Sequence, residues 1–243
     1  CKGVGQVTDR IEKAYYLKQE ELAVLLALQG VQQLYGFRMD MAGNMNKEEL
    51  HKILFEMARK NLLSVTGRCI EMDTDLSAVL KDLVQAETVL HLTGTEEYPD
   101  CCVYIGVNLV FSQLLGQNGQ ICRLEPVNRQ DAYLKMREYG FLAPGVLERT
   151  GIYAEEEKDC PQIQELAGKL YAQEKECVIQ QKEIGCCLTQ YSAMEGRKGR
   201  QLLIVNGVLE DYLTLSSDGQ NLVYVYSDEK ARELLEEMMG GRR

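Results

Sequence analysis

The stretch that decides the fold is residues 186–239, CCLTQYSAMEGRKGRQLLIVNGVLEDYLTLSSDGQNLVYVYSDEKARELLEEMM. Short runs of β-branched and aromatic residues alternate here with Gly-rich and Asp-Gly segments. This pattern is typical of consecutive antiparallel strands that are joined by tight turns. The segments GRKGR and SDGQ are the predicted turns. The stretch therefore predicts an antiparallel meander.

The end of this stretch predicts a helix that covers the sheet. Alternate residues of a strand point to opposite faces, so Leu222, Tyr224 and Tyr226 share one face of the last strand. The segment DEKARELLEEMM that follows repeats apolar residues at helical spacing. We expect Ser227 or Asp228 to cap this helix, and a glycine pair to end it. The apolar positions are Ala231, Leu234, Leu235 and Met238, and the glycines are Gly240 and Gly241.

Three helices are expected in the N-terminal third of the chain. The first spans residues 18–35, is apolar on more than one side, and is expected to stop at Gly36. The second begins at Asn46, which can form a capping box with Glu49. After a short turn, SVTGR, the third begins at Thr74 and runs to about His91. These helices predict a bundle with the first helix at its centre.

A hairpin and further helices are expected in the middle of the chain. The apolar runs CVYIGVNLVFSQLL and ICRLEPV flank a loop at Gly116–Gly119. A helix follows at residues 128–140. The acidic run at residues 154–159 reads as a solvated connection. Pro161 suits the first turn of another helix, and a strand is expected from about Glu176.

The order of elements predicts the fold class. Helices, a hairpin, further helices, a meander and a last helix indicate an α+β protein with an antiparallel sheet rather than alternating βαβ units. The acidic run would divide the chain into residues 1–153, with the N-terminal bundle, hairpin and helix, and residues 154–243, with a helix, the meander and the C-terminal helix. We expect these two parts to form one integrated domain.

Composition and charge narrow the class of partner. The chain has 243 residues, of which 45% are hydrophobic, so it can bury a sizeable core. A net charge of -10 argues against nucleic acid or an anionic membrane as the main partner, because phosphate binding depends on clustered Lys and Arg. We find neither an apolar run of membrane-spanning length nor a signal-peptide core, which predicts a cytoplasmic protein.

The sequence shows no pattern for a metal, a cofactor or an enzyme active site. The nine cysteines form no CxxC and no regular framework, so we interpret them as reduced. The adjacent pairs at 101–102 and 186–187 would point to opposite faces of a strand, which makes them poor chelates. His51 and His91 lack a metal-binding spacing. GxGxxG, GxxxxGK[ST] and GxSxG motifs are all absent. An enzyme with scattered site residues stays open as an alternative.

One cationic cluster stands out outside the C-terminal tail. Arg197, Lys198 and Arg200 lie within the predicted turn GRKGR. Such a cluster is either a soluble hairpin tip or a contact for an anion or an acidic partner. The residues alone leave both interpretations open.

A winged-helix regulator is a further alternative, because three helices followed by a hairpin is also its order of elements. Its recognition helix would be residues 74–91. That segment carries Lys81 as its only Lys or Arg against Asp75, Asp82 and Glu87, so DNA phosphates would repel it. This charge pattern disfavours DNA binding.

Three segments of the chain resemble the EspG-type proteins of type VII secretion. The C-terminal segment RKGRQLLIVNGVLEDYLTLSSDGQNLVYVYSDEKARELLEEM is similar to the end of that family. The segment YYLKQEELAVLLALQG resembles its opening, where a short strand runs into a helix. HKILFEMARKNLLSVTGRCIEMDTDLSAVLKDLVQAE is similar to the segment that comes next. One departure is that Tyr224 and Tyr226 stand where the family's late strand often has a Trp.

The resemblance implies a non-enzymatic cytosolic chaperone or adaptor without cofactors. The fold it implies is a quasi-symmetric α+β arrangement with a central antiparallel sheet flanked by two helical bundles. The partner it implies is a helical secretion substrate, which in that family is a PE-PPE pair. Contacts in the family involve the long loop of the first hairpin and the C-terminal helical side. Carried onto this sequence, that loop is Leu114, Leu115, Gly116, Gln117, Asn118 and Gly119.

Overall fold

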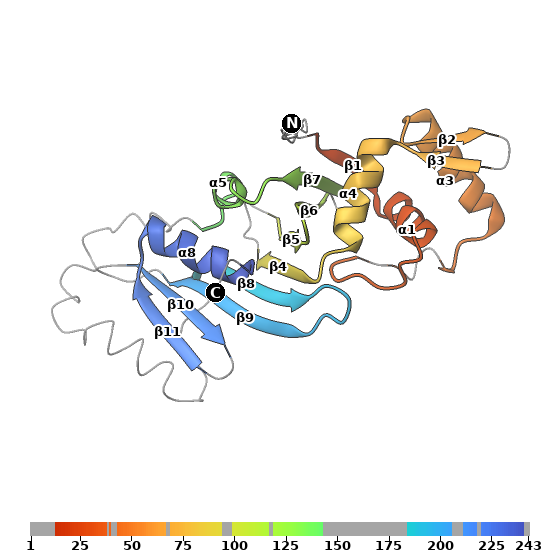
Figure 1. The fold of residues 1–243 in the computed structure, drawn as a ribbon. Coiled ribbons are helices and arrows are strands. Elements are labelled where there is room, and N and C mark those ends of the chain that lie inside the picture. The colour runs from red at the N-terminus through yellow and green to blue at the C-terminus, as the bar shows by residue number, and fades with distance from the viewer. Residues whose placement is uncertain are drawn as a thin grey trace, which may run out of the picture.

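Strands from both halves of the chain form one nine-stranded sheet, in which every neighbouring pair of strands is antiparallel (Figure 1). The structure is a computed structural model that describes residues 13–37, 39, 43–66, 69–93, 99–116, 119–142, 184–205, 211–217 and 220–240. The strand order is β1-β7-β6-β5-β4-β8-β9-β10-β11. The strands are β1 (Tyr15–Lys18), β4 (Thr88–Thr93), β5 (Cys101–Ile105), β6 (Leu109–Leu115), β7 (Ile121–Val127), β8 (Ile184–Ser192), β9 (Lys198–Val205), β10 (Tyr212–Ser217) and β11 (Gln220–Val225).

Helices cover both faces of this sheet. On one face, the core includes residues of α1, α3 and α4; on the other, it includes residues of α5 and α8. Adjacent strand residues divide between the two cores: Leu90 and Val103 belong to one, and Val89 and Tyr104 to the other. The predicted α+β class with a central antiparallel sheet is therefore confirmed. The helices are α1 (Gln19–Leu28), α3 (Lys47–Arg59), α4 (Thr74–Val84), α5 (Ala132–Glu138) and α8 (Asp228–Met238).

The sheet has a quasi-two-fold arrangement about the β4–β8 pair. On one side of this pair lie β5, β6 and β7 in sequence order, and on the other side lie β9, β10 and β11. Each series is followed by a helix, α5 after β7 and α8 after β11, and both helices contribute to the same core. A rotation about an axis through the β4–β8 pair, normal to the sheet, would therefore exchange β4–β7 with β8–β11, whereas β1 has no counterpart among the described strands.

The first helix is shorter than the sequence predicts. It ends at Leu28 rather than at residue 35, and Gly30 follows with a φ of 79°. A left-handed residue just past the last turn is the common way to end a helix, and Gly adopts it without a steric penalty. Leu22, Val24 and Leu25 are all buried, as expected for a helix covered on several sides. The short strand before it, β1, agrees with the resemblance.

The second helix begins as predicted. The Asn46 side chain accepts hydrogen bonds from the backbone N–H groups of Glu48 and Glu49, at 3.0 and 2.9 Å. In return, the Glu49 carboxylate accepts the N–H of Asn46 at 3.0 Å, which completes the capping box. Where only a turn was expected after α3, the chain forms a separate two-stranded sheet of β2 (Leu63–Thr66) and β3 (Cys69–Met72).

The prediction of a helix to His91 is wrong. Helix α4 ends at Val84, and residues 88–93 form β4, a strand in the interior of the sheet. Val89, Leu90 and Leu92 are fully buried because β4 packs against helices on both faces. A strand of this kind carries apolar residues on both faces and lacks clean alternation, so its pattern resembles a helix. The helix that a winged-helix domain would use for recognition is therefore limited to α4, and the apolar side of α4 is buried in the core.

The predicted hairpin and helix form in the middle of the chain, and the hairpin gains one additional strand. The first apolar run is split at Gly106 into β5 and β6, and β6 pairs with β7 across the predicted loop. Helix α5 forms within residues 128–140, with Met136 buried and Leu134 exposed.

The C-terminal meander and helix are confirmed. Strands β8 to β11 pair in sequence, and α8 follows them. Ser227 caps α8 by accepting the N–H of Lys230 at 3.1 Å, and Gly240 follows the helix with a φ of 77°. The predicted apolar stripe of α8 is buried. The expected acidic connection, the helix at Pro161, the start of the strand at Glu176 and the second glycine, Gly241, lie outside the described residues.

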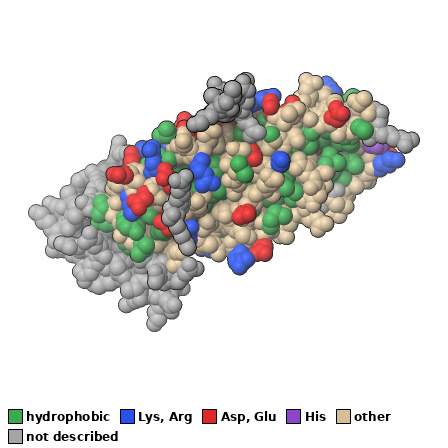
Figure 2. Space-filling view, in the orientation of Figure 1, with side chains coloured by type: hydrophobic (Ala, Val, Ile, Leu, Met, Phe, Trp, Pro, Cys, Tyr) green, Lys and Arg blue, Asp and Glu red, His purple; other side chains and the backbone are tan. Residues whose placement is uncertain are grey.

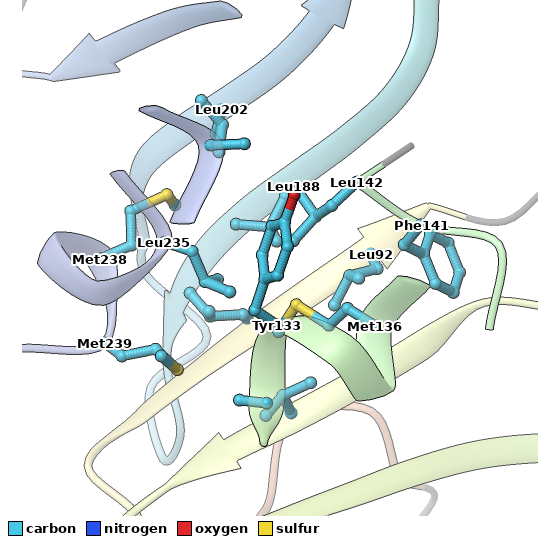
Figure 3. Packing of buried hydrophobic residues seen from close by; sticks show 14 of the residues in the cluster. Leu92, Tyr133, Met136, Phe141, Leu142, Leu188, Leu202, Leu235, Met238 and Met239 are labelled. Carbon is cyan, nitrogen blue, oxygen red and sulfur yellow. The ribbon is translucent and has the colours of Figure 1, made fainter. Parts of the chain in front are cut away.

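Helices α5 and α8 pack together over the centre of the sheet. Figure 3 shows Tyr133 of α5 close to Leu235 of α8 and to Leu188 of β8, with Met136 of α5 and Met238 of α8 on either side. These side chains belong to one buried cluster that also includes residues of β4 to β10. The cluster therefore contains residues from both sides of the quasi-two-fold axis. In the part of the chain that the structure describes, no helix is both long and apolar enough to cross a membrane.

Candidate functional site

The predicted hairpin loop lies at one end of the sheet, between β6 and β7. Leu115 is paired with Ile121 and Leu114 with Cys122 at the base of the loop. Gly116 and Gly119 have φ angles of 83° and 64°, which only Gly adopts without strain. Leu114 is 37% exposed, and Leu115 is half-buried. Gln117 and Asn118 lie outside the described residues.

Strand β1 places the exposed Tyr16 near the exposed Ile121 of β7 at this end of the sheet. In the pairing of β1 with β7, Lys18 lies opposite Ile121 and Tyr16 opposite Arg123. Tyr16 is 56% exposed and Ile121 is 41% exposed. Large exposed apolar side chains that gather in one place mark interaction sites in soluble proteins. Tyr16, Leu115 and Ile121 lie on one face of the sheet, and we call this group the hairpin-edge surface. Leu114 pairs with Cys122 and points to the opposite face.

Tyr16 and Ile121 were missed by the sequence reasoning. Each belongs to a short segment in which an exposed apolar residue is unremarkable. Their proximity follows only from the pairing of β1 with β7, which joins residues more than 100 positions apart. The local sequence carries no signal for that pairing.

A buried carboxylate lies behind this surface. The Glu125 side chain pairs with Lys135 at 2.7 Å, with the Arg123 guanidinium, and accepts a hydrogen bond from the Tyr139 hydroxyl. Burial by itself would raise the pKa of the Glu125 carboxyl. The hydrogen bonds from Lys135 and Tyr139 and the charge of Arg123 outweigh burial and hold the pKa below its ordinary value. This network joins β7 to α5.

The basic cluster is only partly a turn. The turn between β8 and β9 ends at Arg197, and Lys198 and Arg200 lie in β9. The predicted turn is therefore shifted toward the N-terminus. Arg197 pairs with Glu195 at 2.6 Å, and its side chain is 77% exposed. Lys198 is exposed and, within the described residues, makes no ion pair.

Arg200 of β9 binds the C-terminal end of α8. Its guanidinium pairs with the Glu237 carboxylate at 2.8 Å and donates to the Glu237 carbonyl oxygen at 3.2 Å. Gln190 and Arg129 donate to the next two carbonyl oxygens, those of Met238 and Met239. These donors satisfy carbonyl groups that the end of a helix leaves without partners. Arg200 thus holds α8 on the sheet.

The two predicted clusters lie at opposite ends of the sheet. Leu115 and Ile121 lie at the end of the strands where β6 runs into β7. The β8–β9 turn lies beside Thr88, Ile105 and the β5–β6 turn, which are at the other end. One small ligand therefore does not contact both clusters. Figure 2 shows acidic and basic side chains interspersed on the face that it draws.

His91, Cys101, Cys102 and Cys122 are placed in structural roles. His91 accepts or donates hydrogen bonds to the Tyr35 hydroxyl and to Asp100, both at 3.1 Å. Burial raises the pKa of Cys102 and of Cys122 to about 12, so neither is a thiolate at neutral pH. Cys101 and Cys102 face opposite cores, as predicted. Over the described ranges, no three His, Cys, Asp or Glu side chains come together as metal ligands.

A shallow cleft of about 360 Å³ lies between the start of α1 and the side of α3. Lys18 crosses it and pairs with Glu56 at 2.8 Å. Its lining mixes both signs of charge with two apolar side chains. The lining residues are Lys18, Glu20, Asn44, Met45, Glu49, Lys52, Ile53 and Glu56.

The fold defines a class of protein in which helices cover both faces of a long antiparallel sheet with quasi-two-fold order. Within this class, the chain is similar in structure to the chaperone EspG5 of the type VII secretion system of Mycobacterium tuberculosis, solved in complex with a PE25-PPE41 dimer. The TM-score is 0.51 with 11% sequence identity, over 95% of this chain and 97% of EspG5. At this identity the likeness concerns the fold. No family model and no curated protein matches the sequence.

Proposed function

We propose that the chain is a non-enzymatic cytoplasmic chaperone or adaptor that binds a helical protein substrate of a type VII-like secretion system. The observation that carries this proposal is the likeness to EspG5 over nearly the whole length of both chains. EspG5 was solved in complex with a PE25-PPE41 dimer. A helical protein is therefore the class of partner that we assign to this chain.

The hairpin-edge surface is the place where we expect this partner to bind. Tyr16 and Ile121 expose apolar area on neighbouring strands, and Leu115 extends it toward the loop. Leu114, which is exposed on the opposite face of β6, is included in the proposed contact because it adjoins the loop. Aromatic and aliphatic side chains of this kind act as anchors when they are buried in an interface. We include Gly116, Gln117, Asn118 and Gly119 in the proposed contact because they form the loop between these strands.

The basic residues Arg197 and Lys198 are a second, separate candidate contact. They are exposed at the opposite end of the sheet, where they could meet an acidic segment of the same partner. Arg200 is less suited to this role because Glu237 already neutralises it.

Co-expression tests the proposed function directly. Small helical proteins encoded beside this chain's gene would each be produced alone and together with the chain. We expect at least one of them to be insoluble alone and to co-purify with the chain as a soluble complex of defined stoichiometry. The proposal fails if every such protein is equally soluble without the chain and none binds it.

A further inference from the structure

Arg123 of β7 lies among the residues of the hairpin-edge surface. Tyr16 of β1 and Gln113 of β6 are its direct partners in the two neighbouring strands. Ile121 precedes it by two residues in the same strand. Side chains at these positions of an antiparallel sheet point to the same face. A cation therefore stands beside the exposed apolar side chains that we expect a partner to cover.

The guanidinium of Arg123 is bound on the side that faces away from Ile121. It pairs with the carboxylate of Glu125, two residues further along β7, and its Cζ lies 5.0 Å from the centre of the Tyr139 ring. The Nε atom of Arg123 is buried, and only 23% of the side chain is exposed. The charge of Arg123 is thus directed toward α5 and the core rather than toward the apolar residues.

The charges of this network compensate one another. Glu125 pairs with Arg123 and with Lys135, and Lys135 also pairs with the exposed Glu138 at 3.2 Å. The network therefore joins two cations to two carboxylates. Within the described residues, Glu125 is the one carboxylate that pairs with Arg123. Loss of its charge would leave the guanidinium uncompensated beside Tyr16 and Ile121.

We propose that Glu125 is a positioning residue that holds the Arg123 charge inward, so that the hairpin-edge surface selects an apolar, uncharged segment of its helical partner. This inference rests on the proposed function. A partner that covers Tyr16 and Ile121 also removes water from Arg123, and an unpaired guanidinium would lose its hydration there without compensation. The contact with Glu125, made before the partner binds, removes that cost.

A double-mutant cycle tests this role. Glu125→Gln keeps the shape of the side chain but removes its charge, and Arg123→Met removes the guanidinium. We expect Glu125→Gln to weaken binding of the helical protein identified by co-expression about tenfold. The double variant should bind as tightly as Arg123→Met alone, because no guanidinium is then left to compensate.

An arginine at another place on the same helix layer provides the matched control. Asp228→Asn releases Arg137 from its carboxylate at the contact between α5 and α8, outside the hairpin-edge surface. Its affinity should stay within about twofold of the wild type. All variants are compared under conditions in which circular dichroism shows them to be folded.

Three binding results would overturn the inference. Unchanged affinity in Glu125→Gln would show that the Arg123 charge does not matter to the partner. Tighter binding would show that the partner presents an anion to Arg123. A loss that Arg123→Met does not repair would mark Glu125 as a purely structural residue.

A measurement on the free protein separates this inference from the proposed function. The heteronuclear Overhauser effect of the Arg123 Nε–H group should report a rigid guanidinium in the wild type and a mobile one in Glu125→Gln. A mobile guanidinium in the wild type would overturn the inference. If the wild-type chain binds no helical protein, the proposed function fails, and with it the role in partner selection. The Overhauser effect then still decides whether Glu125 holds Arg123.

Discussion

The guanidinium of Arg137, in the last turn of α5, lies 2.7 Å from the carboxylate of Asp228, the first residue of α8. The same carboxylate accepts hydrogen bonds from the hydroxyls of Tyr226 and Tyr133, at 2.8 and 3.1 Å. Arg137 and Asp228 belong to the two helices that the quasi-two-fold axis relates. This contact therefore links the halves of the molecule at the surface, above the core they share.

Replacing Asp228 with Asn should weaken this link modestly. The side chain is 60% exposed, so solvent screens the ion pair, and we expect a loss of about 1 kcal/mol in the free energy of unfolding. The hydrogen bond from Tyr226, followed by those from Tyr133 and Arg137, lowers the pKa of Asp228. Its contribution is then present above the unfolded pKa and disappears as the pH falls through the lower native value. Thermal unfolding at pH 7 and pH 3 measures both effects, and an equal loss at both pH values would contradict them.

Replacing Glu125 with Ala should be far more damaging. This change leaves Lys135 and Arg123 without their buried partner, and breaking such a pair typically costs about 3–5 kcal/mol. The matched control is Glu138→Ala, which removes a 64% exposed carboxylate that pairs with the same Lys135 at 3.2 Å. We expect a change below about 1 kcal/mol there. Denaturant unfolding followed by circular dichroism compares the two variants, and similar losses would refute the assigned role.

The pH dependence of the same network has a definite sign. The pKa of Glu125 lies below its ordinary value of 4.5, so the native state binds this proton less readily than the unfolded state. The stabilisation is therefore complete above the ordinary pKa and is lost as the pH falls through the native pKa. In Glu125→Gln the acid-induced loss of stability should be smaller than in the wild type. An identical acid titration of the two proteins would show that Glu125 does not contribute.

The two parts of the chain, residues 1–153 and 154–243, should unfold together as one domain. Leu188 of β8 is fully buried in the core that includes Leu90 and Leu92 of β4 and residues of α5 and α8. Leu188→Ala should therefore cost about 2–5 kcal/mol and lower a single transition. The exposed Leu134 is the matched control, and Leu134→Ala should change stability by less than about 0.5 kcal/mol. Differential scanning calorimetry measures the unfolding transitions. The prediction is contradicted if the protein shows two transitions and Leu188→Ala lowers the temperature of only one of them.

A charge on the hairpin-edge surface should weaken partner binding without unfolding the protein. Ile121→Asp places a carboxylate where we expect an apolar contact, and burial of an unpaired charge should weaken binding more than about tenfold. Val107→Asp is the control, because Val107 is 84% exposed at the opposite end of the sheet. Titration of the helical partner by calorimetry measures both. Equal affinities for the two variants would move the binding site elsewhere.

The sequence by itself determined the features that depend on neighbouring residues. The capping box of Asn46 and Glu49, the Ser227 cap and the apolar stripe of α8 each follow from side chains within one or two helical turns. The strands of the C-terminal meander and the β6–β7 hairpin follow from short-range alternation and Gly-rich turns. These elements, placed in order, were enough to predict the α+β class.

Only the tertiary structure decided the features that depend on distant residues. His91 lies in a strand because β4 pairs with β5 and β8 and is buried on both faces, and its local pattern resembles a helix. Tyr16 and Ile121 lie on the same face of neighbouring strands because β1 pairs with β7, which is more than 100 residues away in the sequence. Arg200 is part of the sheet rather than of a free cationic tip because α8 folds back over β9. Strand pairing and helix docking are set by the burial of apolar area summed over the whole chain, which no local segment encodes.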